Sequence, residues 1–112
     1  MNRSVRLSDS AEEDILRNAV WWADNHSIDE AIEWEAVVRR QLLEISCQPD
    51  SHSLLSESHE LKYVIREALI GKGQKGSYGA VFFMSGDKVV VLRLLRASQQ
   101  AIRPEELPKE FN

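Results

Sequence analysis

The feature that most constrains the fold of this chain is a change in the spacing of its apolar residues. From Ser10 to about Cys47 the apolar residues recur every three or four positions, which is the spacing of amphipathic helices. From Leu61 the period changes to two, which is typical of β-strands. Two helices followed by a run of strands predict an α+β fold in which a helical hairpin packs on a sheet.

Two capping-box sequences predict where the helices begin. Ser10-Ala11-Glu12-Glu13 opens the first helix, and Ser27-Ile28-Asp29-Glu30 opens the second after a break at Asn25-His26. Because the link is so short, the two helices should form an antiparallel hairpin. The residues expected on the apolar stripes are Ile15, Ala19 and Trp22, with Leu16, Val20 and Ala23 beside them, in the first helix, and Ile28, Ala31, Ile32, Trp34, Val38, Leu42 and Ile45 in the second.

The strands are predicted at both ends of this hairpin. They are Arg3–Leu7, a segment beginning at Leu61 with Leu61, Tyr63, Ile65 and Leu69 on one face, Tyr78–Ser85, and Lys88–Arg96 after a tight turn at Gly86-Asp87. The polar stretch Gln48–Ser58 is predicted to be a loop. The order is therefore β-α-α-β-β-β, with a mainly antiparallel four-stranded sheet. We interpret residues 1–112 as one domain and 104–112, which contain two prolines, as a candidate flexible tail.

The composition narrows the class of protein. The chain has 112 residues, 43% of them hydrophobic and 29% charged, and no run long enough to span a membrane. Its start lacks the apolar core of a signal peptide, and Cys47 is the single cysteine, so we expect a cytoplasmic protein without a disulfide. Residues 1–60 carry 13 acidic and 5 basic side chains, whereas residues 61–103 carry 2 and 8. The basic segment could offer a surface to an anionic ligand.

Several motifs are present without the context that their chemistry needs. Gly71, Gly73 and Gly76 match the dinucleotide pattern G-x-G-x-x-G, but a strand follows them where a phosphate-binding helix is required. The three histidines lack metal-ligand spacing, and His52 and His59 are expected to face solvent. We therefore predict no metal and no cofactor.

Four short motifs, taken in order, resemble the RelE/ParE superfamily of bacterial toxins from type II toxin–antitoxin systems. Residues 10–14 (Ser-Ala-Glu-Glu-Asp) look like the family's opening "sxxAexDl", and Tyr63–Glu67 looks like its "xxvRel" strand. Gly76–Phe83 resembles "gxYRvlYx", and Gly86–Leu92 resembles the "dgxvxVL" hairpin. The likeness covers the chain from Val5 to about Ile102.

The resemblance implies two alternative activities. RelE-like members cut messenger RNA on the ribosome, and ParE-like members poison DNA gyrase. Both kinds are neutralised by a cognate antitoxin whose C-terminal segment wraps the toxin, so the implied partners are an antitoxin and either gyrase or the ribosome. A homodimer or a toxin–antitoxin hetero-oligomer would follow from the same resemblance. No membrane partner is implied.

This chain departs from the family's ribonuclease set. Gly79 stands where the family has arginine after the motif tyrosine, Gln99 stands where a basic residue is usual, and no tyrosine follows Tyr78. A positioned cation in phosphoryl transfer is worth several kcal/mol of barrier, so these departures favour the ParE-like branch. A non-toxic antitoxin-binding module is a third interpretation. Whether the chain is an enzyme stays open, because only the RelE-like alternative is one.

Basic and aromatic side chains are the candidate site residues. Arg66 fills a family basic position, and Arg93 and Arg96 are expected on opposite faces of the last strand because strand side chains alternate. The three arginines are the weak catalytic candidates, and Trp21 and Arg93 are the candidates for contact with an antitoxin. The candidates for binding the target are Arg66, Lys72, Lys75, Tyr78, Arg93 and Arg96.

Overall fold

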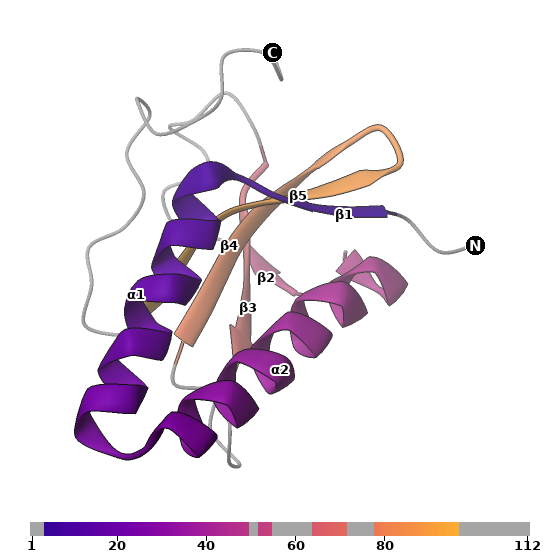
Figure 1. Ribbon diagram of the computed structural model, residues 1–112. Coiled ribbons are helices and arrows are strands. Elements are labelled where there is room, and N and C mark those ends of the chain that lie inside the picture. Colours follow the sequence, from indigo (N-terminus) through magenta and orange to yellow (C-terminus); the bar gives the residue numbers. More distant parts are fainter. Residues whose placement is uncertain (1–3, 50–51, 55–63, 72–77, 97–112) are drawn as a thin grey trace.

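The computed structural model describes residues 4–49, 52–54, 64–71 and 78–96 of the chain. Figure 1 shows a pair of helices lying against a single sheet. The elements in chain order are β1 (Ser4–Leu7), α1 (Asp9–Asn25), α2 (Ile28–Glu44), a 3₁₀ turn (Ile45–Cys47), β2 (Ser53–Leu54), β3 (Arg66–Ile70), β4 (Tyr78–Ser85) and β5 (Lys88–Arg96). None of the described helices is long and apolar enough to cross a membrane.

The sheet has the strand order β1-β5-β4-β3-β2. The pairs β5–β4, β4–β3 and β3–β2 are antiparallel, and β1 pairs with β5 in parallel. The predicted α+β fold and its mainly antiparallel sheet are confirmed. The structure adds β2, a two-residue strand inside the segment predicted to be a loop, and β3 begins at Arg66 rather than at Leu61. Leu61 and Tyr63 lie outside the described residues.

Each face of the sheet has its own apolar cluster. The face toward the helices packs against Ile15, Trp34, Val38 and other buried residues of α1 and α2. The opposite face carries a second buried cluster, made of Ile65, Val81, Phe83, Val90, Leu92 and Leu95. Because β4 and β5 supply alternate residues to both clusters, they are the buried centre of the sheet, which explains their nearly continuous apolar sequences.

The predicted apolar stripes of the helices are too wide. Ile15, Trp34, Val38, Leu42 and Ile45 are buried as expected, and Trp22 is partly buried against the core. For four other residues the prediction of burial is wrong, because only one side of each helix reaches the sheet. Their exposed fractions are 55% for Leu16, 60% for Val20, 69% for Ile28 and 63% for Ile32. On β3, Leu69 is also exposed, although Ile65 is buried.

The first helix begins two residues before the position that the capping box indicates. Ser8, not Ser10, is the N-cap: its Oγ accepts a hydrogen bond from the N–H of Ala11 at 3.0 Å. The same hydroxyl donates to the carbonyl of Leu92 at 2.8 Å and so ties the start of α1 to β5. The second cap is as predicted, since Ser27 accepts from the N–H of Glu30 at 3.1 Å.

Substitution of Ser8 should therefore reveal which serine caps α1. Ser8→Ala is expected to lower the free energy of unfolding by about 1–2 kcal/mol, because the change removes a cap and a bond to the sheet. Ser10→Ala, which changes an exposed residue inside the helix, is the matched control and should cost less than about 0.5 kcal/mol. Chemical denaturation of both variants measures the difference. Equal losses would contradict the assignment of Ser8.

Candidate functional site

Helix α1 covers the part of β5 that β1 leaves open. Strand β1 pairs with β5 only as far as Val91, and polar groups of α1 then take over the same edge. The N–H of Ser8 donates to the carbonyl of Val91 at 2.9 Å, and the N–H of Leu94 donates to Oδ2 of Asp14 at 2.9 Å. The backbone of Ser8, the N-cap of α1, and the side chain of Asp14 thus satisfy backbone groups of β5 that a neighbouring strand would otherwise bind.

Arg93 is anchored at this edge by the buried carboxylate of Asp14. Its Nε donates to Oδ2 at 2.7 Å and its NH2 donates to Oδ1 at 3.1 Å, which is a bidentate pair. The Asp14 side chain is 2% exposed and the Arg93 side chain 19%. Arg17, which is 63% exposed, adds a third donor to Oδ1 at 3.1 Å. Asp14 therefore carries much of the contact between α1 and β5.

Arg96 lies next to this pair and also contacts α1. Its Nε donates to Oδ1 of Asn18 at 3.2 Å, and its guanidinium carbon lies 4.5 Å from the centre of the Trp21 ring. Trp21 is 39% exposed and meets Trp22 edge to face, with 5.6 Å between the ring centroids. The structure thus brings three of the predicted site residues, Trp21, Arg93 and Arg96, to one end of the α1–β5 contact.

The expectation that Arg93 and Arg96 lie on opposite faces of the strand agrees with the register of β5, but it does not keep the two side chains apart. Both side chains reach α1. Arg93 pairs with Val81 of the second cluster and Arg96 with Tyr78 of the core cluster, but α1 packs along the edge of β5 between the two faces. An edge position lets side chains from either face bend toward the same helix.

Tyr78 lies behind this group rather than on the surface. It is 5% exposed, and its ring centroid is 5.4 Å from that of Trp34. Although Tyr78 is paired with Arg96 in the register of β4 and β5, its ring belongs to the core cluster. Its proposed contact with a target therefore requires its side chain to move or the target to reach its edge. Lys72 and Lys75 lie outside the described residues.

Arg66 lies apart, on the far side of β4. Its NH1 donates to the carbonyl of His52 at 2.8 Å, and the His52 ring meets the edge of Phe82 with 5.7 Å between centroids. His52 is partly buried, so the expectation that it faces solvent is wrong. Burial lowers the pKa of His52, and the charge of Arg66 lowers it further. The structure therefore places the His52 imidazole and the Arg66 guanidinium side by side, a pairing that the sequence alone did not indicate.

At Gly79, where the resemblance expects arginine, the neighbouring side chain is acidic. A Cβ at Gly79 would overlap the carboxylate of Glu67, which leans across it from β3. Leu69, the residue paired with Gly79 across the two strands, is 70% exposed. An acidic group thus lies over the place where a cation would have to hold a phosphate, and this part of the sheet is poorly suited to binding one.

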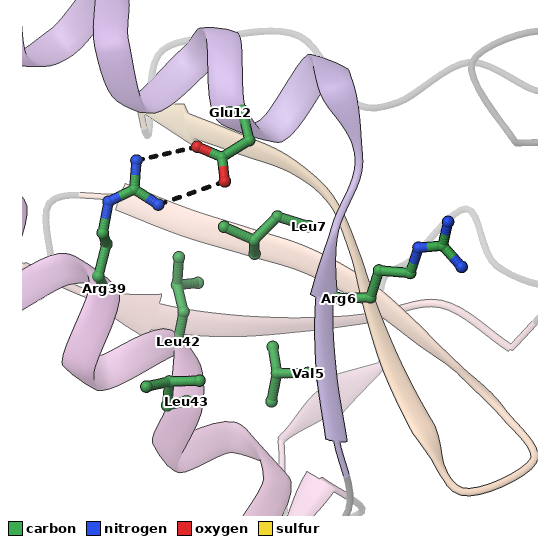
Figure 2. Close-up of a pocket in the computed structure, with 7 residues that line it drawn as sticks. All are labelled: Val5, Arg6, Leu7, Glu12, Arg39, Leu42 and Leu43. Atoms are coloured by element: carbon green, nitrogen blue, oxygen red, sulfur yellow. Dashed lines mark hydrogen bonds and ion pairs between the residues drawn. The ribbon is translucent and has the colours of Figure 1, made fainter.

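A groove separates β1 from α2, and its floor is apolar (Figure 2). It has a volume of about 410 Å³ and is lined by Val5, Arg6, Leu7, Glu12, Arg39, Leu42 and Leu43. Strand β1 is the last in the sheet order, so among the described residues its outer edge has no strand partner. An open strand edge beside an apolar groove is the arrangement that binds extended peptides.

An ion pair closes one end of the groove. Arg39 donates to both oxygens of Glu12, at 2.9 and 3.3 Å, and to Glu35 at 2.9 Å (Figure 2). The hydrogen bonds and the positive charge of Arg39 lower the pKa of Glu12, against an opposing effect of burial. Because both side chains are more than a third exposed, solvent weakens this pair.

The shift in Glu12 predicts a small dependence of stability on pH. A lowered pKa in the folded state means that the stabilisation is complete above the ordinary pKa of 4.5 and is lost as the pH falls through the lower folded value. Glu12→Gln is therefore expected to cost under about 1 kcal/mol at pH 7 and nothing at pH 2. Denaturation at the two pH values tests this, with Glu13→Gln, an exposed neighbour, as control. A cost that persists at pH 2 would contradict the assignment.

The described residues contain no group of three or more His, Cys, Asp or Glu side chains placed to hold a metal ion. Cys47 is exposed.

Comparison with known proteins is informative about the fold. No protein-family model and no curated protein matches the chain. Among solved structures, a chain of the "Chromosomal ParDE TA system from P. aeruginosa" matches with a TM-score of 0.68 and 14% identity, over 84% of this chain and 95% of that chain. At this identity the match shows a shared fold. It confirms the fold expected from the RelE/ParE resemblance.

Proposed function

We propose that this chain is the toxin of a type II toxin–antitoxin pair, that it is ParE-like, and that it arrests growth by poisoning DNA gyrase in the bacterial cytoplasm. The observation that carries the proposal is the fold, which matches a chain of a ParDE system over nearly all of that chain's length. The order of the four sequence motifs supports the same family. Gyrase is the expected target by analogy alone, since a fold hosts more than one function.

The surroundings of the arginines favour this proposal over a ribonuclease. Cleavage of RNA needs cations that are held ready for a phosphate that gains charge in the transition state. Arg93 instead binds the buried Asp14 through two hydrogen bonds, and Glu67 lies over Gly79. In the RelE-like alternative, Arg66 and the neighbouring His52 are the residues on which RNA cleavage would depend, so substituting them tests it. A non-toxic module that only binds an antitoxin is the third outcome.

The groove beside β1 is the surface that we assign to the antitoxin. An extended segment could add to the open edge of β1 through backbone hydrogen bonds and place alternate apolar side chains against Val5, Leu7 and Leu42. Trp21 and Arg93 remain the proposed antitoxin contacts at the edge where α1 meets β5. The proposed target contacts are Arg66, Lys72, Lys75, Tyr78, Arg93 and Arg96.

Purified protein tests the proposed target directly. The chain is incubated with gyrase and plasmid DNA in one assay, and with ribosomes and messenger RNA in another. We expect DNA cleavage products from gyrase and intact messenger RNA. Arg96→Ala, which removes an arginine at the α1–β5 edge, should weaken the effect on gyrase, whereas Arg40→Ala, which changes an exposed arginine of α2, should not.

The alternatives predict other results. Cut messenger RNA that depends on Arg66 and His52 would establish the ribonuclease and contradict the proposal. A folded protein without effect in either assay would indicate the non-toxic module.

A further inference from the structure

The face of the sheet that is turned away from the helices has a notch at Gly79. In the register of the sheet, Gly79 is paired with Leu69 of β3 on one side and with Leu95 of β5 on the other. Leu69 is 70% exposed, whereas Leu95 is buried in the second cluster. Because glycine has no side chain, this row of three residues has a leucine at each end and only backbone between them. We call Leu69, Gly79 and Leu95 the notch.

The carboxylate of Glu67 lies in the notch. Glu67 is two residues before Leu69 on β3, so the two side chains share a face of the sheet. A Cβ built on Gly79 would lie 2.8 Å from Cδ of Glu67 and would overlap its Oε2, so the carboxylate lies directly against the glycine. Glu67 is partly buried in this position. Its side chain therefore reaches across to the neighbouring strand instead of extending into solvent.

The surroundings of Glu67 leave its carboxylate without a donor. Within residues 4–49, 52–54, 64–71 and 78–96, the Glu67 side chain takes part in no hydrogen bond and no ion pair. Its cross-strand partner on β4 is Val81, which is apolar and 1% exposed. A partly buried carboxylate that lacks donors is costly, and a cation that supplies donors would lower this cost.

We propose that the notch and the Glu67 carboxylate bind an arginine side chain of a partner protein. A guanidinium is planar and weakly hydrated, so it fits flat against the backbone of Gly79 while two N–H groups donate to the carboxylate. The methylene stem of the same side chain packs against the exposed Leu69. A nucleic acid would instead be repelled by the carboxylate. This surface is neither the groove beside β1 nor the α1–β5 edge, so the inference goes beyond the proposed function.

Two peptides that differ in a single group test the proposal. The probe is acetyl-Leu-Gly-Arg-Gly-Leu-amide, and its matched control carries citrulline, the uncharged analogue of arginine. Titration of the isotope-labelled full chain, followed by NMR, should give a Kd on the order of 1 mM for the arginine peptide. The citrulline peptide and spermidine should each bind at least about fivefold more weakly. The amide signals of Glu67, Leu69 and Gly79 should shift most.

Three variants separate the charge of Glu67 from its position. Glu67→Gln keeps the size of the side chain and should weaken the arginine peptide at least about fivefold, whereas Asp87→Asn, at an exposed carboxylate of the β4–β5 turn, should change binding less than about twofold. Gly79→Ala keeps the carboxylate but displaces it from the notch, and should weaken binding about as much as Glu67→Gln. The amide spectrum of each variant verifies that it is folded.

Three outcomes would overturn the proposal. The first is equal binding of the arginine and citrulline peptides, and the second is an equal effect of Glu67→Gln and Asp87→Asn. The third is spermidine that binds as tightly as the arginine peptide, because the notch would then be a site for any small cation.

Discussion

Asp14→Ala is expected to lower the free energy of unfolding by about 3–5 kcal/mol, because it leaves a largely buried guanidinium without its carboxylate. Asp14 accepts two hydrogen bonds from Arg93, at 2.7 and 3.1 Å, and one from the N–H of Leu94 at 2.9 Å. The substitution would orphan a buried backbone donor as well as a charge. Urea denaturation followed by circular dichroism measures the loss.

Substitutions of Arg17 and Arg93, which both donate hydrogen bonds to Asp14, make this prediction specific. Arg17→Ala, which removes the exposed third donor, should cost less than about 1 kcal/mol. In the double variant Asp14→Ala/Arg93→Met the loss should be smaller than the sum of the single losses, because the methionine no longer needs a carboxylate. Additive losses, or a cost of Asp14→Ala no larger than that of Arg17→Ala, would contradict the role that the structure gives to this pair.

Trp34→Ala is the second large effect, with an expected loss of about 3–5 kcal/mol. Trp34 is 1% exposed and lies between the rings of Tyr78 and Trp22, at centroid distances of 5.4 and 6.5 Å. It joins α2 to the sheet, and alanine would leave a cavity that rigid neighbours cannot fill. Thermal unfolding and urea denaturation both report the change.

A phenylalanine at the same position separates packing from hydrogen bonding. The indole N–H of Trp34 is buried and has no hydrogen-bond partner among the residues that the structure describes. Trp34→Phe therefore removes volume but no hydrogen bond, and should cost about 2 kcal/mol less than alanine. Trp21→Ala, at a ring that is 39% exposed, is the control and should cost about 1 kcal/mol. Equal losses from Phe and Ala would contradict a packing role.

The elements that depend on local spacing could be predicted from the sequence. Ser27 has a cap geometry that its own neighbours determine, and the bounds of β4 and β5 follow from apolar runs between clear turn signals. The start of α1 could not be predicted, because Ser8 is selected by its bond to the carbonyl of Leu92, which is 84 residues away in the chain. The exposure of Leu16 and Ile32 also depends on which side of each helix meets the sheet.

The candidate site, too, could be predicted from the sequence only in part. The sequence could single out Trp21, Arg93 and Arg96 as candidate site residues, but it could not indicate their partners. Asp14 is the last residue of the first motif, but nothing in its local sequence indicates that it is buried against Arg93. A buried ion pair between residues 14 and 93 leaves no trace in local periodicity. His52, in a polar stretch, likewise gave no sign that it lies against Phe82 and Arg66.

Inducible expression of the chain in a bacterium tests the central claim most directly, with growth, plasmid supercoiling and total protein synthesis followed together. We predict growth arrest with altered supercoiling and DNA breaks while protein synthesis continues, and relief of the arrest when a cognate antitoxin is expressed as well. An immediate stop of protein synthesis with DNA left intact would contradict the proposal that gyrase is the target and would favour the RelE-like ribonuclease instead.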